Sequence, residues 1–245
     1  MATVQPVTPP GRLRQLLAEP RCHMIPSAGD ALSAELGEQA GFPIVFMSGF
    51  AVSAMRIGQP DVGLASYGEM LEAGRDICAA VSIPVIGDGD TGYGNAINVK
   101  RTVDGYARAG FSAVMIEDQV APKRCGHTRG KLVVDRQEAV ARIRAADDAR
   151  REGRDILILA RTDARHGHGL TEAIDRAAAF KEAGADILFV EAPQSVEEME
   201  TICRELPGPK MANMVEGGAT PILPVAELGE IGYSIATYPL TLMSA

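Results

Sequence analysis

The sequence predicts an α/β protein of the (β/α)8 TIM-barrel class, formed as a single domain over residues 1–245. Short apolar runs alternate with longer helix-like segments along the whole chain, as in repeated βα units. There are eight such runs, the number of strands that closes a TIM barrel. The runs are continuously apolar, as strands buried on both faces of a parallel sheet should be. A doubly wound open sheet is the alternative, but the first run is followed by Ser27-Ala28-Gly29-Asp30, which does not match a GxGxxG phosphate loop.

The predicted elements follow one another regularly. Strands are expected at 22–26, 43–47, 83–87, 113–117, 155–160, 186–191, 209–214 and 233–237. Helices with 3.6-residue periodicity are expected at 31–40, 68–80, 96–109, 136–151, 171–183 and 195–205. Gly110 and Gly184 directly follow two of these helical patterns and predict C-caps that lead into the next strand. A closing helix of about 11–12 residues hardly fits between Thr237 and Ala245, so the C-terminal helix region is expected to be missing from this chain.

Composition excludes several classes of protein. The chain carries 24 basic and 32 acidic residues, has no basic run and contains no Trp, so a nucleic-acid partner is not expected. The longest nearly apolar stretch, 43–55, is shorter than the roughly 18 residues of a membrane span. The first 20 residues lack a basic-then-apolar signal pattern, so no membrane association and a cytoplasmic location are expected. The four cysteines lie far apart without a CxxC pair, which argues against a zinc site or a disulfide framework.

Polar side chains follow most of the predicted strands, where the active site of a TIM barrel lies. They are, in strand order, Ser48 with Gly49 and Phe50, then Asp88 and Asp90, Glu117, Arg161, Glu191, and Asn213. Strands that ended at random would deliver mostly Gly, Asn and Pro to this rim. The pattern therefore predicts a functional site there.

Asp88 and Asp90 are flanked by glycines and suit a hard cation such as Mg²⁺, with Mn²⁺ as a second possibility. A solvated turn is the alternative for an Asp-Gly-Asp sequence. Glu117 and Glu191 on the same rim favour the metal, because several carboxylates around one cavity repel one another without a cation.

The segment 122–131 is a long cationic loop that suits a lid over the site. Cys125 lies in it beside Lys123, Arg124 and Arg129, which should favour the thiolate and make the thiol a usable acid or base. His127 is expected to order the loop by a hydrogen bond rather than to act in catalysis. Arg161 can hold a substrate carboxylate bidentately, and an ion pair with Glu191 or Asp163 is the alternative.

Six motifs together resemble the isocitrate lyase/phosphoenolpyruvate mutase superfamily. They are Gly-Asp-Gly-Asp-Thr-Gly (87–92), Ile-Glu-Asp-Gln (116–119), Lys-Arg-Cys-Gly-His (123–127), Ala-Arg-Thr-Asp-Ala (160–164), Phe-Val-Glu-Ala-Pro (189–193) and Ala-Asn-Met-Val-Glu-Gly-Gly-Ala-Thr-Pro (212–221). The resemblance extends from about residue 12 to residue 239. The Lys-Arg-Cys-Gly-His motif is its most specific part.

The resemblance implies a modified TIM barrel that binds Mg²⁺ and an α-hydroxy- or α-keto-carboxylate. Asp88, Asp90, Asp61 and Glu117 match its metal-site positions, and Cys125 matches the acid/base of its lyases, with Glu117 and Arg161 as the other catalytic candidates. The candidate substrate-binding residues are Ser48, Gly49, Phe50, Asp88, Gly126, His127, Arg161, Glu191 and Asn213. Phe50, Tyr93 and Tyr238 are candidates for the pocket lining. The resemblance also suggests a homotetramer that exchanges C-terminal helices between subunits.

The loop distinguishes branches of this superfamily. After a shared Pro-Lys, the loop of its phosphoenolpyruvate mutases has a sequence that resembles Thr-Asn-Ser, whereas this chain has Arg-Cys-Gly-His. This difference favours carbon–carbon cleavage. The expected activity is a Mg²⁺-dependent lyase that splits a 2-alkylmalate, 2,3-dimethylmalate or 2-methylisocitrate type of substrate into an α-keto acid and a carboxylate. Oxaloacetate hydrolase activity and a carboxyphosphonoenolpyruvate or phosphonopyruvate mutase type of activity remain the alternatives.

Overall fold

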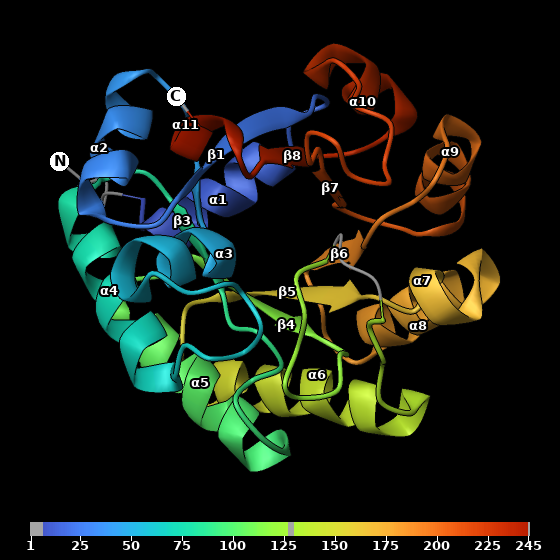
Figure 1. The fold of residues 1–245 in the computed structure, drawn as a ribbon, viewed down its shortest axis with the longest axis horizontal. Coiled ribbons are helices and arrows are strands. Elements are labelled where there is room, and N and C mark those ends of the chain that lie inside the picture. Colours follow the sequence, from blue (N-terminus) through green and yellow to red (C-terminus); the bar gives the residue numbers. More distant parts are fainter. Residues whose placement is uncertain (1–6, 127–129, 245) are drawn as a thin grey trace, which may run out of the picture.

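Eight parallel strands form a barrel in the computed structural model, which describes residues 7–126 and 130–244 (Figure 1). The strands are β1 (His23–Ala28), β2 (Val45–Met47), β3 (Val85–Asp88), β4 (Ala113–Glu117), β5 (Leu157–Thr162), β6 (Ile187–Val190), β7 (Met211–Asn213) and β8 (Ile235–Tyr238). Their order is β6-β5-β4-β3-β2-β1-β8-β7. A parallel bridge between Leu188 and Lys210 joins β6 to β7 and nearly closes the ring. The predicted barrel class is thereby confirmed, with strand ends shifted by a few residues.

Helices surround the barrel (Figure 1). The six predicted helices are present as α2 (Ala31–Gln39), α4 (Tyr67–Ala80), α5 (Ala96–Ala109), α6 (Arg136–Arg151), α8 (Leu170–Glu182) and α9 (Val196–Glu205). Capping boxes begin three of them, at Asp30, Ser66 and Asn95, where the side chain accepts a hydrogen bond from the backbone N–H of the first turn. Gly110 ends α5 in the left-handed conformation, as its position after the helical pattern predicts.

Six further helical segments are present that the sequence periodicity does not predict. They are α1 (Pro9–Leu17), α3 (Gly49–Val52), a π-helix at Ser53–Ile57, α7 (Arg165–His168), α10 (Val225–Ile231) and α11 (Thr241–Ser244). Most of them are too short to show a 3.6-residue period. The start of α1 does carry a signal, because Thr8 caps the helix and prolines occupy its first turn.

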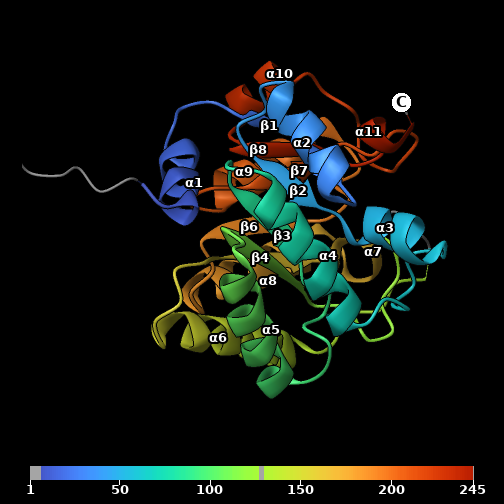
Figure 2. The same cartoon turned by 90° about the vertical axis from the view of Figure 1, so that its left-hand side faces the viewer.

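The first helix closes one end of the barrel. Leu13, Leu16 and Leu17 of α1 pack in one buried cluster with inward-facing strand residues such as Ile25 and Leu157. Figure 2 shows α1 at one end of the molecule and α3 and α11 at the other. The carboxyl ends of the strands therefore face away from α1, and a ligand site is to be sought at that open end.

Strand register brings site residues together at the open end. Glu117, the last residue of β4, is paired with Arg161 of β5, and Asp88 of β3 is paired with Met115 of β4. Since successive strands end on the same rim, their terminal side chains meet there. No helix within the described ranges, 7–126 and 130–244, is long and apolar enough to cross a membrane.

The packing of α1 leads to a stability prediction. Leu16 is 1% exposed, so Leu16→Ala should leave a cavity beneath the barrel and lower the free energy of unfolding by about 2–5 kcal/mol. Urea denaturation measures this change. Leu32→Ala, at a side chain 63% exposed, is the matched control and should shift stability by no more than about 0.5 kcal/mol. Equal losses in the two variants would contradict the proposed packing role of α1.

Candidate functional site

A cavity of about 160 Å³ opens at the carboxyl ends of the strands. It is smaller than the roughly 300–1,000 Å³ typical of sites for drug-sized ligands, so it suits a small molecule. Nine of the predicted site residues line it: Ser48, Phe50, Asp61, Asp88, Cys125, Gly126, Arg161, Glu191 and Asn213. Its floor is apolar, because Phe46, Met115, Phe189 and Met211 of the barrel core also face it.

Other predicted residues lie outside this lining. Asp90 and Glu117 are buried beside it. His127 lies outside the described residues. Tyr93 and Tyr238, two of the three aromatic candidates, are not among the lining residues. The hydroxyl of Tyr93 lies 3.4 Å from that of Tyr106, and the hydroxyl of Tyr238 donates a hydrogen bond to the carbonyl of Leu223 at 2.9 Å.

Backbone amides hold Asp88 in place. Its Oδ2 accepts a hydrogen bond from the N–H of Gly49 at 3.1 Å, and its Oδ1 accepts one from the N–H of Asp90 at 3.0 Å. A Cβ atom at position 49 would lie 2.7 Å from Asp88 Oδ2, which explains the glycine there. Asp90 adopts a φ of 47°, a conformation uncommon for a residue with a side chain. Both neighbours thus support the orientation of one carboxylate.

Lys123 lies within the acidic cluster. Its Nζ is 2.6 Å from Asp61 Oδ1 and 2.8 Å from Asp90 Oδ1. Burial alone would lower the pKa of Lys123, but Asp90, Asp88 and Asp61 outweigh it and raise this pKa well above its ordinary value. Burial raises the pKa of Asp90 to about 7 even though Lys123 opposes the shift. The ammonium group of Lys123 is therefore paired with two buried carboxylates.

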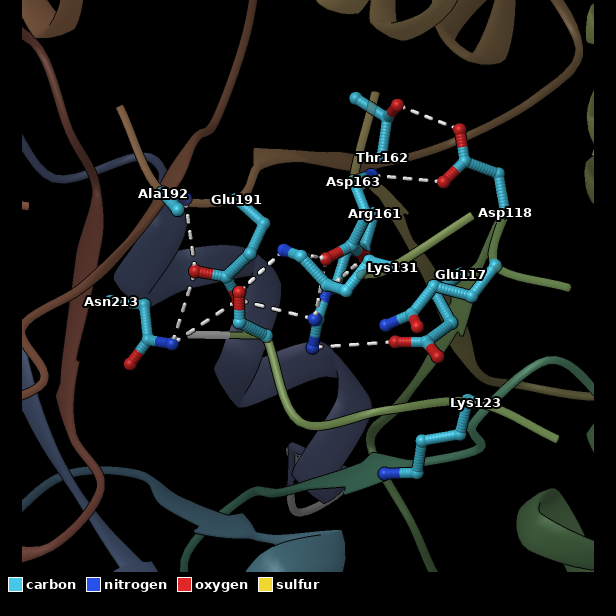
Figure 3. Close-up of polar contacts among 12 residues, drawn as sticks. Glu117, Asp118, Lys123, Lys131, Arg161, Thr162, Asp163, Glu191, Ala192 and Asn213 are labelled. Carbon is cyan, nitrogen blue, oxygen red and sulfur yellow. Dashed lines mark hydrogen bonds and ion pairs between the residues drawn. The ribbon is translucent and has the colours of Figure 1, made fainter. Parts of the chain in front are cut away.

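Arg161 connects three carboxylates (Figure 3). Its Nε and Nη2 donate to Asp163 at 2.8 and 3.0 Å, and its Nη1 and Nη2 lie 3.3 and 3.4 Å from Glu117 and Glu191. Burial alone would lower the pKa of Arg161, but Asp163, Glu117 and Glu191 raise it well above its ordinary value. The sequence left two roles open for Arg161: holding a substrate carboxylate, or pairing with Glu191 or Asp163. The ion pairs with Asp163 and Glu191 are present, and Arg161 also lines the cavity.

Glu117 and Glu191 differ in their surroundings. Glu117 Oε1 is buried and has no hydrogen-bond partner among the described residues. Burial raises the pKa of Glu117 well above its ordinary value, and Arg161 only partly opposes the shift. Glu191 accepts hydrogen bonds from Asn213 Nδ2, at 3.2 and 3.3 Å, and from the N–H of Ala192, at 3.0 Å (Figure 3). Glu117 is therefore the carboxylate with spare hydrogen-bonding capacity.

The loop that follows β4 reaches the barrel at Gly126. A Cβ atom there would lie 2.6 Å from Arg161 Nη2 and from Glu191 Oε2, so only glycine allows this close approach. Lys131 Nζ donates to the carbonyl of Gly126 and lies 2.6 Å from Asp163 Oδ1. The sequence pattern does not single out Lys131, and it indicates Asp163 only as a possible ion-pair partner of Arg161. The excess of acidic residues on the rim does indicate that further cations lie there, because buried carboxylates need buried cations as partners.

The residues present fit a divalent cation. Six buried carboxyl groups meet three buried cations in this part of the described structure, so negative charge is in excess: Asp61, Asp88, Asp90, Glu117, Asp163 and Glu191 against Lys123, Lys131 and Arg161. Within the described ranges, no three His, Cys, Asp or Glu side chains converge as a ready-made ligand group. Mg²⁺ does not require one, because it is commonly held by one or two carboxylates, waters and substrate oxygens.

Comparison with known proteins shows what the chain is similar to. The family described as phosphoenolpyruvate phosphomutase matches residues 13–245. The chain is 48% identical to 2,3-dimethylmalate lyase of Eubacterium barkeri over 93% of its length and 78% of that protein. It is 42% identical to 2-methylisocitrate lyase of Aeropyrum pernix over 98% of its length and 77% of that protein.

Solved structures show the same fold. A crystal structure of 2,3-dimethylmalate lyase has a TM-score of 0.93 and 42% identity, covering 98% of this chain and 81% of that one. Oxaloacetate acetylhydrolase bound to 3,3-difluorooxalacetate has a TM-score of 0.94 and 36% identity, covering 98% and 82%. Phosphonopyruvate hydrolase bound to oxalate and Mg²⁺ has a TM-score of 0.83 and 34% identity, covering 97% and 82%. The family match and these identities show that this chain belongs to the phosphoenolpyruvate phosphomutase family, in the isocitrate lyase/phosphoenolpyruvate mutase superfamily.

Proposed function

We propose that this protein is a Mg²⁺-dependent carbon–carbon lyase that splits a 2-hydroxy dicarboxylate or tricarboxylate into an α-keto acid and a carboxylate. The substrate is of the 2-alkylmalate, 2,3-dimethylmalate or 2-methylisocitrate type. The observation that carries the proposal is the meeting of Cys125, Arg161 and buried carboxylates at one small cavity. The relatives named as 2,3-dimethylmalate lyase and 2-methylisocitrate lyase support it.

Asp88 and Asp90, supported by Asp61 and Glu117, would hold Mg²⁺, with Mn²⁺ as a second candidate. The bound ion would polarise the hydroxyl and carboxylate oxygens of the substrate. The neighbour solved with oxalate and Mg²⁺ supports this assignment. Ser48, Gly49, Phe50, Asn213, Gly126 and His127 are proposed to bind the substrate.

The proposed reaction is a retro-aldol cleavage. Glu117, whose Oε1 has no hydrogen-bond partner among the described residues, or Glu191 takes the proton of the 2-hydroxyl, directly or through a water that they hold. The C2–O bond becomes a carbonyl as the C2–C3 bond breaks, and the electron pair of that bond passes to C3. Arg161 stabilises the resulting enolate of the second fragment. Cys125 then donates its proton to C3 and completes the carboxylate product.

Oxaloacetate hydrolysis is the second candidate, because oxaloacetate acetylhydrolase has a TM-score of 0.94 to this chain. A phosphonate mutase activity is the third. Incubation with 2-methylisocitrate, 2,3-dimethylmalate, 2-ethylmalate, oxaloacetate and phosphonopyruvate, while keto acid, acetate and phosphate are followed, separates the three. Keto acid from a substituted malate supports the lyase; turnover of oxaloacetate or phosphonopyruvate alone contradicts it.

The proposal extends to assembly and location. We propose a homotetramer that exchanges C-terminal helices between subunits and acts in the cytoplasm on a small carboxylic acid. The absence of a membrane-spanning helix among the described residues is compatible with this location. Light scattering coupled to size-exclusion chromatography of the full protein tests the tetramer.

Removal of the Cys125 thiol tests the acid. Cys125→Ser should lower kcat by about 10²–10⁴-fold, because a hydroxyl is a much weaker acid at this position. Mg²⁺ and product binding should remain nearly unchanged by calorimetry. Cys78→Ala, at a partly buried cysteine of α4, is the matched control and should keep full turnover. Unchanged turnover of Cys125→Ser would exclude the acid role.

Metal removal tests the carboxylates. Dialysis against a chelator should abolish turnover, and Mg²⁺ at 100 times its dissociation constant should then stabilise the fold by about 2.7 kcal/mol. Asp88→Asn should lose this stabilisation, measured as the shift of Tm with added Mg²⁺. Asp175→Asn, at a half-exposed carboxylate in α8, serves as control. Full activity of the chelated protein argues against the metal assignment.

The ion pairs of Asp163 give a stability prediction. Asp163→Asn removes the carboxylate that both Arg161 and Lys131 contact, so two buried cations lose a partner and stability should fall by about 3–5 kcal/mol. Asp155→Asn is the control: it breaks a surface pair with Arg14 and should cost no more than about 1 kcal/mol. Guanidinium denaturation of the two variants makes the comparison. Similar losses of stability in the two variants would contradict a larger contribution of the buried Asp163 ion pairs than of a surface pair.

A further inference from the structure

Gln119 makes an unusual pair of contacts. It lies two residues beyond β4 and is 1% exposed. Its side-chain Nε2 donates to the carbonyl of Arg124 at 2.9 Å, and its Oε1 accepts from the N–H of Arg124 at 3.0 Å. One side-chain amide thus satisfies both backbone groups of a single residue, in the manner of a neighbouring strand. The chemistry proposed for the site gives Gln119 no part.

Gln119 is itself firmly anchored. Nη1 of Arg142, a buried residue of α6, donates to the carbonyl of Gln119 at 2.9 Å. Gln119 is also paired with Val133 in an antiparallel bridge, and the N–H of Val120 donates to the carbonyl of Leu132 at 2.8 Å. Because its backbone is held from two directions, Gln119 can impose a position on Arg124.

Arg124 lies between two loop residues that contact the site. On one side, Lys123 reaches Asp61 and Asp90. On the other, Cys125 lines the cavity. Fixing the N–H and the carbonyl of Arg124 fixes the path of the backbone at the points where both side chains leave it.

We propose that Gln119 is a positioning residue that holds Cys125 and Lys123 at the site through the backbone of Arg124. Its effect on turnover rests on the proposed lyase function, whereas its effect on the placement of Cys125 does not. The test therefore measures both.

Two variants remove the amide contacts to different extents. Gln119→Met keeps the size of the side chain and loses both hydrogen bonds, while Gln119→Glu keeps an acceptor for Arg124 N–H and loses the donor. In Gln119→Met, the rate at which iodoacetamide alkylates Cys125 should rise about tenfold. Peptide mass spectrometry in the absence of substrate measures this rate. The rates at Cys78 and Cys203 should stay unchanged. Gln119→Glu should show a smaller rise, and it also serves if Gln119→Met fails to fold.

Turnover provides the second measurement. Gln119→Met should lower kcat by about tenfold or more, as expected from two lost hydrogen bonds, while KM changes less than about threefold. Val120→Thr, at the adjacent side chain, which is 40% exposed, is the matched control and should match the wild type in both measurements.

The outcomes are distinct. Unchanged alkylation of Cys125 in both variants overturns the proposal, and so does an equal rise at Cys78, Cys203 and Cys125, which would indicate general loosening. A selective rise at Cys125 supports it. If the wild type cleaves none of the substituted malates, the lyase proposal fails, and the alkylation rates still decide the role of Gln119.

Discussion

Repulsion among buried carboxyl groups at the carboxyl end of the barrel is the constraint on which the rest of the site depends. Carboxylates this close, and this far from water, destabilise one another unless cations or shared protons intervene. Three buried cations of this site, Lys123, Lys131 and Arg161, reduce this repulsion, and each lies between at least two acceptors. Lys123 lies between Asp61 and Asp90, and Arg161 between Asp163, Glu117 and Glu191. The negative charge that remains is what makes a bound divalent cation physically reasonable.

The same charges tie the loop to the barrel. Lys131 contacts both the loop, at the carbonyl of Gly126, and the barrel, at Asp163, which in turn holds Arg161. Asp163 is oriented by its neighbour strand, because its N–H donates to Asp118 Oδ1 at 2.9 Å and Thr162 donates to Asp118 Oδ2 at 2.7 Å (Figure 3). A chain of buried contacts thus runs from the end of β4 through β5 to the loop, and the position of one member depends on the others.

Much of this arrangement could be predicted from sequence. Continuous apolar runs of strand length, repeated eight times, were sufficient for the barrel, and the rim position of Asp88, Glu117, Arg161 and Glu191 followed from where their strands end. Ion pairs of Arg161 with Asp163 or Glu191 were among the expectations, but the lysine partners of the carboxylates could not be predicted in the same way. Lys123 and Lys131 lie in an irregular loop, where no periodicity indicates which side chains turn inward. Short elements such as α3 and the π-helix depend on tertiary packing rather than on local propensity.

The closure of the barrel by α1 has a kinetic consequence. The leucines of α1 and the apolar layer beneath the cavity fill the barrel interior, so the space above them opens at the carboxyl ends of the strands. In the proposed cleavage, two products form in this space and share that route out. We expect the fragment nearer the opening to leave first and the deeper one second. Release is then ordered, and in the reverse direction the two products add in a compulsory sequence. The deeper product should inhibit competitively with the substrate, and the outer one should show a different inhibition pattern.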